Sequence, residues 1–137
     1  MSSDKINPIA GPYELGSGGG GGGSVTEMTL EEVKIPKSIS STATTCPVTF
    51  KWTSTKGTNK NPTGNGTAFF FLGNDLMKTS PNISQGTVTI DIIDVIKNSS
   101  LSSNEITLKV VDAYNNFLQL KFTITTIAIE LKSNFVT

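Results

Sequence analysis

The chain has 137 residues, 36% of them hydrophobic and 16% charged, a size that suits one domain with a flanking segment. Eleven basic residues, all of them lysine, balance eleven acidic residues, and histidine is absent. Without arginine the chain lacks the bidentate readers of phosphate and guanine, so we expect no nucleic-acid binding; without histidine it lacks the commonest general base and metal ligand.

Residues 1–15 form a short polar segment that is broken by Pro8 and Pro12. The segment has neither the basic start nor the apolar run of a signal peptide, and no stretch of the chain approaches the length of a membrane span. Its large apolar side chains have no core of their own: Ile6, Ile9, Tyr13 and Leu15. Two interpretations stay open: a disordered tail, and an extended arm that docks on a partner through these four side chains.

The glycine-rich stretch GSGGGGGGS occupies residues 16–24 and contains six consecutive glycines: Gly18, Gly19, Gly20, Gly21, Gly22 and Gly23. Glycine loses the most backbone entropy on ordering, so we expect a flexible hinge with a root-mean-square span of roughly 15–18 Å. A linker introduced by fusion would look the same. Close packing of three extended glycine chains is a further alternative. In each case the stretch separates the arm from a domain over residues 25–132.

The first half of this domain starts with an ambiguous segment. Thr26 or Thr29 could cap a helix, but the alternation before Pro36 favours a first strand over residues 29–35. Cys46 is the only cysteine, which excludes an internal disulfide. We expect it to be a small buried residue, because a catalytic thiol would need an activating base.

Residues 47–53 alternate between apolar and polar side chains, which predicts a strand with Trp52 turned inward. Trp52 is interpreted as a core residue between two sheets, with ligand stacking as the alternative. Residues 54–66, STKGTNKNPTGNG, predict a long polar surface loop that could also serve recognition. The spacing of a phosphate-binding loop is absent from it.

A third strand is predicted over residues 67–72, TAFFFL, followed by a hairpin turn at residues 73–75 and a second turn at Pro81-Asn82. Three consecutive phenylalanines require that both faces of this strand be covered or that one face meet another chain. Residues 86–93, GTVTIDII, predict a further strand, and residues 94–98 a single helical turn.

Two long strands joined by a polar turn are predicted over residues 104–131, with alternation on both sides of Asp112, Asn115 and Asn116. The alternation shifts at Thr125-Thr126, which predicts a bulge or a continuing strand. No stop signal precedes Thr137, so residues 133–137 are expected to begin a further segment.

About seven strands with short polar connections predict an all-β fold, an immunoglobulin-like sandwich held by packing alone. The expected core takes the inward positions of these strands: Val48, Phe50, Trp52, Phe70, Val88, Ile90, Ile92, Ile106, Leu108, Val110, Leu118, Leu120, Phe122 and Ile124.

Residues that carry chemistry are scarce. The aspartates after the glycine run do not have calcium-loop spacing, and Asp112 is expected to stabilise its turn rather than to join a calcium site at the loop end. No catalytic triad, zinc motif or paired cysteine set is present. Three matches to the glycosylation motif are treated as chance matches in a chain without a secretory signal. We therefore expect neither an enzyme nor a cofactor or metal site.

Several stretches are similar to Ig-like domains in tail, baseplate and fibre proteins of tailed bacteriophages: VTFKWTS at residues 48–54, residues 64–80, QGTVTIDI at residues 85–92 and NEITLKVVDAYNN at residues 104–116. In that family a turn with Asp, Tyr, Gly and Asn follows the penultimate strand. Asp112, Tyr114 and Asn116 match it, and Asn115 stands where the family has glycine; asparagine tolerates the same positive φ.

The resemblance implies a virion component that is made in the host cytoplasm and placed in or on the tail. Its partners would be other virion proteins, with homo-oligomers in the particle and a host-surface protein or glycan as a further partner. The arm would attach to the particle and the glycines would act as a hinge. Two alternatives stay open: an adhesin-type domain of a bacterial surface, and an accessory domain of an enzyme.

Overall fold

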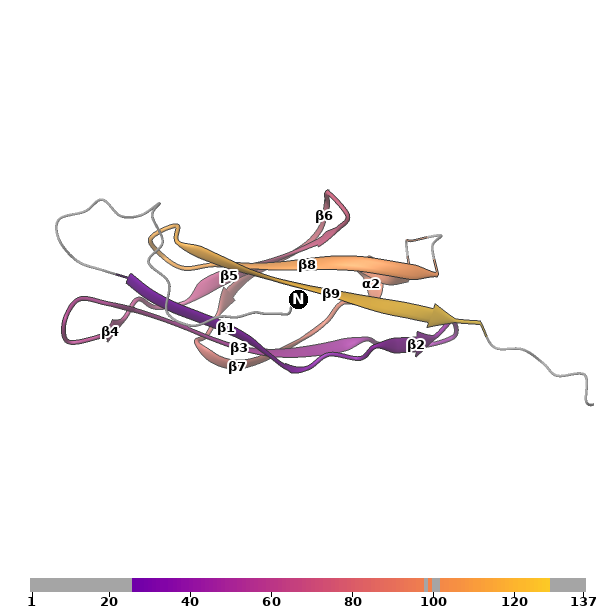
Figure 1. The fold of residues 1–137 in the computed structure, drawn as a ribbon, viewed down its shortest axis with the longest axis horizontal. Coiled ribbons are helices and arrows are strands. Elements are labelled where there is room, and N and C mark those ends of the chain that lie inside the picture. Colours follow the sequence, from indigo (N-terminus) through magenta and orange to yellow (C-terminus); the bar gives the residue numbers. More distant parts are fainter. Residues whose placement is uncertain (1–25, 98, 100–101, 129–137) are drawn as a thin grey trace, which may run out of the picture.

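The protein is an all-β chain whose strands form two facing sheets (Figure 1). A computed structural model describes residues 26–97, 99 and 102–128. The predicted arm, the hinge Gly18–Gly23 and the final segment 133–137 lie outside these residues. The elements within them are β1 (Thr26–Lys34), β2 (Ser38–Ser40), β3 (Pro47–Lys56), β4 (Asn61–Pro62), β5 (Gly66–Leu72), β6 (Asp75–Ile83), β7 (Gly86–Asp91), α2 (Ile93–Lys97), β8 (Ser103–Val111) and β9 (Phe117–Ile127).

The first sheet is built around β3, which is antiparallel to each of its neighbours. β1 pairs along one side of β3, from Thr26 opposite Lys56 to Lys34 opposite Thr49. β7 pairs along the other side as far as Trp52, and β4 takes over beyond it. The alternation of buried and exposed residues in β3 continues past the predicted strand end to Ser54, which is fully buried.

The second sheet has the order β2-β9-β8-β5-β6. Its centre is the predicted pair of long strands, β8 and β9, whose antiparallel register runs unbroken from Ser103 opposite Thr125 to Val111 opposite Phe117. Of the two alternatives predicted at Thr125-Thr126, the bulge is wrong, and the strand continues through these residues to Ile127. β9 keeps its phase, and Ile127 points outward with 54% of its surface exposed.

The turn between β8 and β9 has the predicted backbone. Asn115 adopts φ 70°, so asparagine does take the left-handed conformation that glycine would otherwise supply. The backbone N–H of Asn115 donates to the carbonyl oxygen of Asp112, and the backbone N–H of Asp112 donates to the carbonyl oxygen of Asn116.

Two predicted loops contain strands. The segment 54–66 is in part a hairpin, because β3 extends to Lys56 and β4 returns beside it. The turn predicted at Pro81-Asn82 is wrong, because β6 continues to Ile83. Asn82 at φ 56° lies in a bulge there: Gly66 faces Ile83, whereas Ala68 faces Ser80. An edge strand accepts proline because one side of its backbone has no partner.

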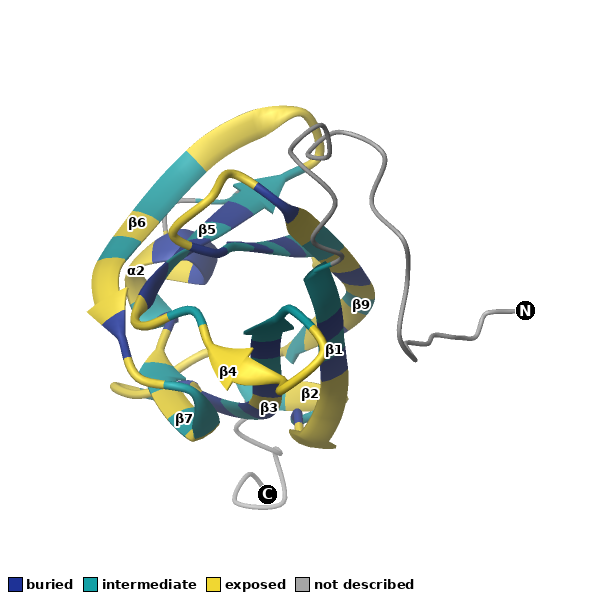
Figure 2. Ribbon diagram, turned by 90° about the vertical axis from the view of Figure 1, so that its left-hand side faces the viewer, coloured by how far each residue is buried: buried dark blue, intermediate teal, exposed yellow. Residues whose placement is uncertain are grey.

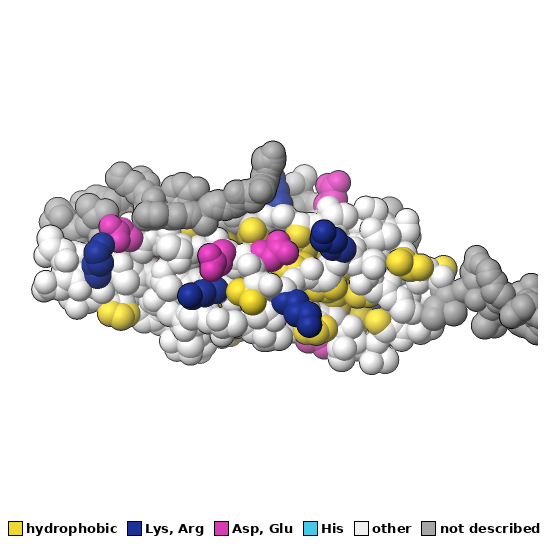
Figure 3. All heavy atoms as spheres, turned by 60° about the horizontal axis from the view of Figure 1, so that its bottom comes forward, with side chains coloured by type: hydrophobic (Ala, Val, Ile, Leu, Met, Phe, Trp, Pro, Cys, Tyr) yellow, Lys and Arg dark blue, Asp and Glu magenta, His cyan; other side chains and the backbone are white. Residues whose placement is uncertain are grey.

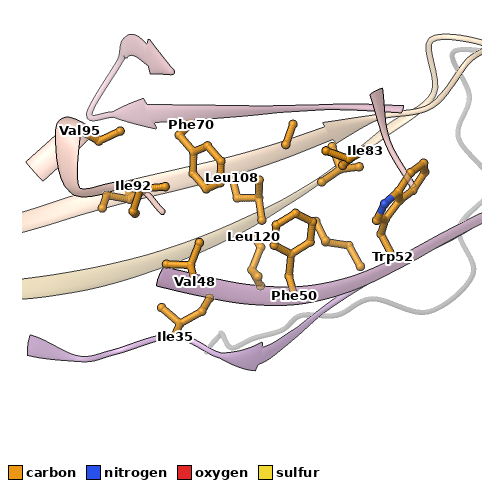
Figure 4. Packing of buried hydrophobic residues seen from close by; sticks show 14 of the residues in the cluster. Ile35, Val48, Phe50, Trp52, Phe70, Ile83, Ile92, Val95, Leu108 and Leu120 are labelled. Carbon is orange, nitrogen blue, oxygen red and sulfur yellow. The ribbon is translucent and has the colours of Figure 1, made fainter. Parts of the chain in front are cut away.

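The core lies between the sheets, with Val48, Phe50 and Trp52 pointing toward Phe70 and Leu108 of the opposite sheet (Figure 4). Ten of the fourteen expected core residues are buried, and four are half-buried against the cluster: Val88, Ile90, Leu118 and Phe122. These four belong to β7 and β9, each of which has an open side along most of its length. The core also includes Cys46, whose burial was expected, and residues that were not expected in it: Met28, Leu30, Ile35, Ala68, Ile83, Val95 and Ile96.

Candidate functional site

One end of the molecule brings together the β3–β4 hairpin and the β8–β9 turn, and Figure 2 looks onto this end. β4 is exposed there (Figure 2), whereas Ser54 and Asp112 are buried. We call residues 54–66 together with residues 112–116 the hairpin end.

Asp112 organises the turn of the hairpin end. One carboxylate oxygen accepts the backbone N–H of Tyr114 at 2.8 Å and that of Asn116 at 2.9 Å. The other accepts Ser54 Oγ at 2.7 Å and Asn116 Nδ2 at 3.2 Å. Because this carboxylate is only 4% exposed, its four donors replace the water that it loses on burial. Asp112 thus acts as the predicted turn stabiliser, and it also ties β3 to the turn.

The side-chain amide of Gln85 continues the sheet where β7 stops. Gln85 Oε1 accepts the N–H of Ser54 at 2.9 Å, and Nε2 donates to the carbonyl oxygen of Ser54 at 2.8 Å. Nε2 also lies 3.1 Å from the carbonyl oxygen of Gly64. One side chain therefore fills the place of a partner strand and holds the β4–β5 connection against β3.

Trp52 packs against the hairpin end at Gly66. Its ring is fully buried, and Nε1 donates to the carbonyl oxygen of Ser84 at 2.8 Å. Gly66 lies directly against it: a Cβ at this position would meet Trp52 Cη2 at 2.7 Å and the carbonyl oxygen of Val111 at 2.5 Å. Glycine is therefore required here for space, whereas its φ is ordinary.

The exposed part of the hairpin end has an aromatic ring under a positive charge. Lys56 Nζ lies 4.2 Å from the centre of the Tyr114 ring, whose residue is 51% exposed. A hollow of about 280 Å³ lies here, lined by Lys56, Gly57, Asn61, Pro62, Thr63 and Tyr114. A second hollow, of about 380 Å³, lies on the second sheet and has Glu105, Thr107, Lys121 and Thr123 among its lining residues. Both are shallow polar places on the surface.

Cys46 is buried beside α2, as predicted, and it is a free thiol. Burial raises the pKa of this thiol to about 11, and the negative charge of Asp91 adds to the rise. Asp91 also accepts the backbone N–H groups of Cys46 at 2.7 Å and Ile93 at 3.0 Å, so it links β3 to the start of α2. A buried thiol with a raised pKa is a poor nucleophile.

The charged side chains form no concentrated patch in the view of Figure 3, where lysines and acidic residues lie interspersed with apolar groups. Among the described residues, no three His, Cys, Asp or Glu side chains lie close enough together to hold a metal ion. No helix in this part of the chain has the length and apolar character needed to cross a membrane.

The predicted partner-binding residues Ile6, Ile9, Tyr13 and Leu15 lie outside the described residues. Sequence reasoning placed Ser54 in a loop and so missed its bond to Asp112. The signal was present in the alternation of Val48, Phe50 and Trp52, which continues in phase to Ser54.

Comparison with protein-family models, with curated proteins and with solved structures gave no match to this chain. The proposals below therefore rest on the residues and their geometry, together with the resemblance noted from the sequence.

Proposed function

We propose that this chain is a structural and interaction module of a tailed-bacteriophage virion, with an Ig-like domain as spacer or binding unit and residues 1–15 as the attachment arm. The observation that carries the proposal is the strand order of the two sheets. The partners are then other virion proteins, in a particle that holds several copies, and the protein has no catalytic role.

The strand order supports the Ig-like assignment. One sheet contains β1, β3, β4 and β7, with β1 on one side of β3 and β7 and β4 on the other, and the second sheet has the order β2-β9-β8-β5-β6. In Ig-like domains the first, second and fifth strands share one sheet, with the second strand between the other two, and the last two strands share the other sheet with the third. β2 pairs in parallel with the last strand, so the beginning of the domain contributes to both sheets.

A sandwich of this kind suits a rigid spacer. Its core closes without a disulfide and includes Trp52, Phe50 and Phe70, all fully buried. Large aromatic side chains bury the most surface and contribute most to such a core. Side-chain bonds from Asp112 and Gln85 brace one end of the domain.

Particle incorporation tests the proposal. Particles assembled with a chain that lacks residues 1–15 should contain none of this protein, whereas particles assembled with the full chain should contain it in stoichiometric amounts. A variant with Ala at Ile6, Ile9, Tyr13 and Leu15 should behave like the deletion. Normal incorporation of both variants would contradict the proposed role of the arm.

The hollow beside Tyr114 favours a second candidate, an adhesin-type domain that binds carbohydrate at the hairpin end. A half-exposed ring beside amide and hydroxyl groups is chemistry that suits a sugar. A glycan-array signal that is lost in Tyr114→Ala and kept in Leu76→Ala, another exposed residue, would support this function. A complete lack of glycan binding would exclude it.

A further inference from the structure

The hollow at the hairpin end contains a positive charge without a counter-ion among the described residues. Lys56 Nζ lies 4.2 Å from the centre of the Tyr114 ring and makes no ion pair in this part of the chain. The other lysine of the hairpin, Lys60, is already paired, because its Nζ lies 2.7 Å from Glu27 Oε1. None of the described residues that line the hollow is acidic. The hollow, of about 280 Å³, therefore presents one uncompensated cation.

The phase of β3 explains why Lys56 is left unpaired. Trp52, Ser54 and Lys56 are alternate residues, so their side chains leave the strand on the same side. Trp52 and Ser54 are fully buried, and Lys56 is where this row reaches the surface, beside the β8–β9 turn. Glu27 lies opposite Thr55, whose side chain points to the other face of the sheet. The nearest exposed acid of β1 is thus on the wrong face to pair with Lys56.

The lining of the hollow is held in place by hydrogen bonds of the fold. The backbone of Lys56 lies between two paired strands, β1 and β4. Thr63 N–H donates to the carbonyl oxygen of Ser54 at 2.9 Å, and Tyr114 N–H donates to the Asp112 carboxylate at 2.8 Å. This carboxylate is 4% exposed and accepts three further donors, so it does not serve as the counter-ion of Lys56. Groups that are already positioned lose little conformational entropy when a ligand binds.

We propose that this hollow binds a saccharide that carries a carboxylate, with Lys56 bound to the carboxylate and Tyr114 in contact with the sugar ring. The inference rests on the second candidate function above, carbohydrate binding at the hairpin end, and names the class of sugar. An ammonium group has three donors, so those that point away from the Tyr114 ring can bond to an anion. The exposed Asn61 and the half-buried Thr63 offer amide and hydroxyl groups to the sugar hydroxyls.

The number and type of donors favour a carboxylate over a phosphate. One ammonium matches the single negative charge of a carboxylate, whereas a phosphate monoester carries a charge of about −1.5 to −2 at pH 7. Phosphate sites usually add arginine or a nest of backbone N–H groups to such a charge, and this chain contains no arginine. The half-exposed ring of Tyr114 supplies the apolar contact that a small inorganic anion could not use.

The contribution of the charge to affinity is modest, because Lys56 lies at the surface. Exposed ion pairs change an equilibrium by at most about fivefold at moderate salt. A sugar with a carboxylate should therefore bind about fivefold more tightly than the same sugar without the charge. The difference should shrink at high salt, since mobile ions screen exposed charges.

Nuclear magnetic resonance titration of the purified, isotope-labelled full chain tests this assignment. The probe is a trimer of galacturonic acid, and the control is the same trimer with its carboxylates methyl-esterified, which removes the charge and keeps the sugar. The acid should bind about fivefold more tightly than the ester. The largest shift changes should fall on the amides of Gly57, Asn61, Thr63 and Tyr114, which line the hollow.

Three variants identify the groups responsible. Lys56→Gln should bind the acid and the ester equally, and Tyr114→Ala should bind neither. Lys121→Gln is the matched control, because Lys121 is an exposed lysine that lines the second hollow. This variant should keep the fivefold preference for the acid. A preference lost equally in Lys56→Gln and Lys121→Gln would mean unspecific attraction between charges and would overturn the proposal.

The results separate this inference from the function on which it rests. Equal binding of acid and ester to the unaltered chain, with shift changes in the hollow, would refute the carboxylate assignment and leave carbohydrate binding standing. Tighter competition by galactose 6-phosphate than by galacturonate would refute it as well. If neither trimer binds, the inference is refuted, and the glycan array then decides carbohydrate binding independently.

Discussion

Gly66→Ala should destabilise the domain strongly, although it adds a single methyl group. The new Cβ would lie 2.5 Å from the carbonyl oxygen of Val111 and 2.7 Å from Trp52 Cη2. Neither neighbour can move freely, because the first belongs to the backbone of β8 and the second to a buried ring whose Nε1 is bonded to Ser84. Overpacking of a core costs about 1–3 kcal/mol, and two simultaneous contacts place the expected loss near 3 kcal/mol.

Urea unfolding followed by circular dichroism measures this loss, and a thermal midpoint lowered by about 10–15 °C should accompany it. Gly73→Ala is the matched control. Gly73 has φ +62° and no atom within 4 Å of an added Cβ, so only backbone strain of about 1 kcal/mol is expected. Trp52→Phe removes Cη2 and should partly relieve the effect of Gly66→Ala, giving a double variant less destabilised than the sum of the single ones. A Gly66→Ala chain as stable as Gly73→Ala would refute the reasoning.

Three further changes have defined outcomes. Trp52→Ala should lower the free energy of unfolding by about 3–5 kcal/mol in urea titrations, whereas the half-exposed Tyr114→Ala should change it by less than about 0.5 kcal/mol. Asp112→Ala leaves Ser54 and Asn116 buried without their acceptor and should cost about 3 kcal/mol by the same measurement, while Asp112→Asn, which keeps an acceptor oxygen, should cost less. The pKa of Cys46 is about 11 in the folded chain against an ordinary 9.0, so the unfolded chain loses this proton first and the free energy of unfolding should fall as pH rises from 9 to 11. Cys46→Ala should remove that part of the pH dependence. An unchanged slope of the free energy of unfolding against pH in this variant would contradict the raised pKa of Cys46.

Strict alternation made much of the sheet structure predictable. It located β3, β8 and β9 and the inward phase of Trp52 and Leu108, because a strand with one covered face must alternate. It could not find the strand ends, since Ser54 and Lys56 are polar and continue β3 through bonds to Asp112 and to β4 that are distant in sequence. The prediction ended β6 before Pro81, because a strand accepts proline only when it lies at the edge of a sheet. Whether a strand lies at an edge is decided by the tertiary structure and cannot be read from the local sequence.

The candidate site was less predictable than the fold. Turn chemistry indicated the role of Asp112 and the φ of Asn115, since both depend on residues close in sequence. The clamp that Gln85 forms on Ser54 and the space required at Gly66 arise from segments far apart in the chain, and no local pattern encodes them. The half-burial of Leu118 and Phe122 likewise depends on which side of β9 is left without a partner.

The pairing of β2 with β9 has a consequence for synthesis. Ser38 lies beside Thr125, so β2, which is synthesised early, can pair with β9 only after nearly the whole domain has been synthesised. Such non-local closure slows folding. Until translation passes β9, the nascent chain exposes β8 and its apolar face, so a chain that terminates within this window would be an aggregation-prone fragment.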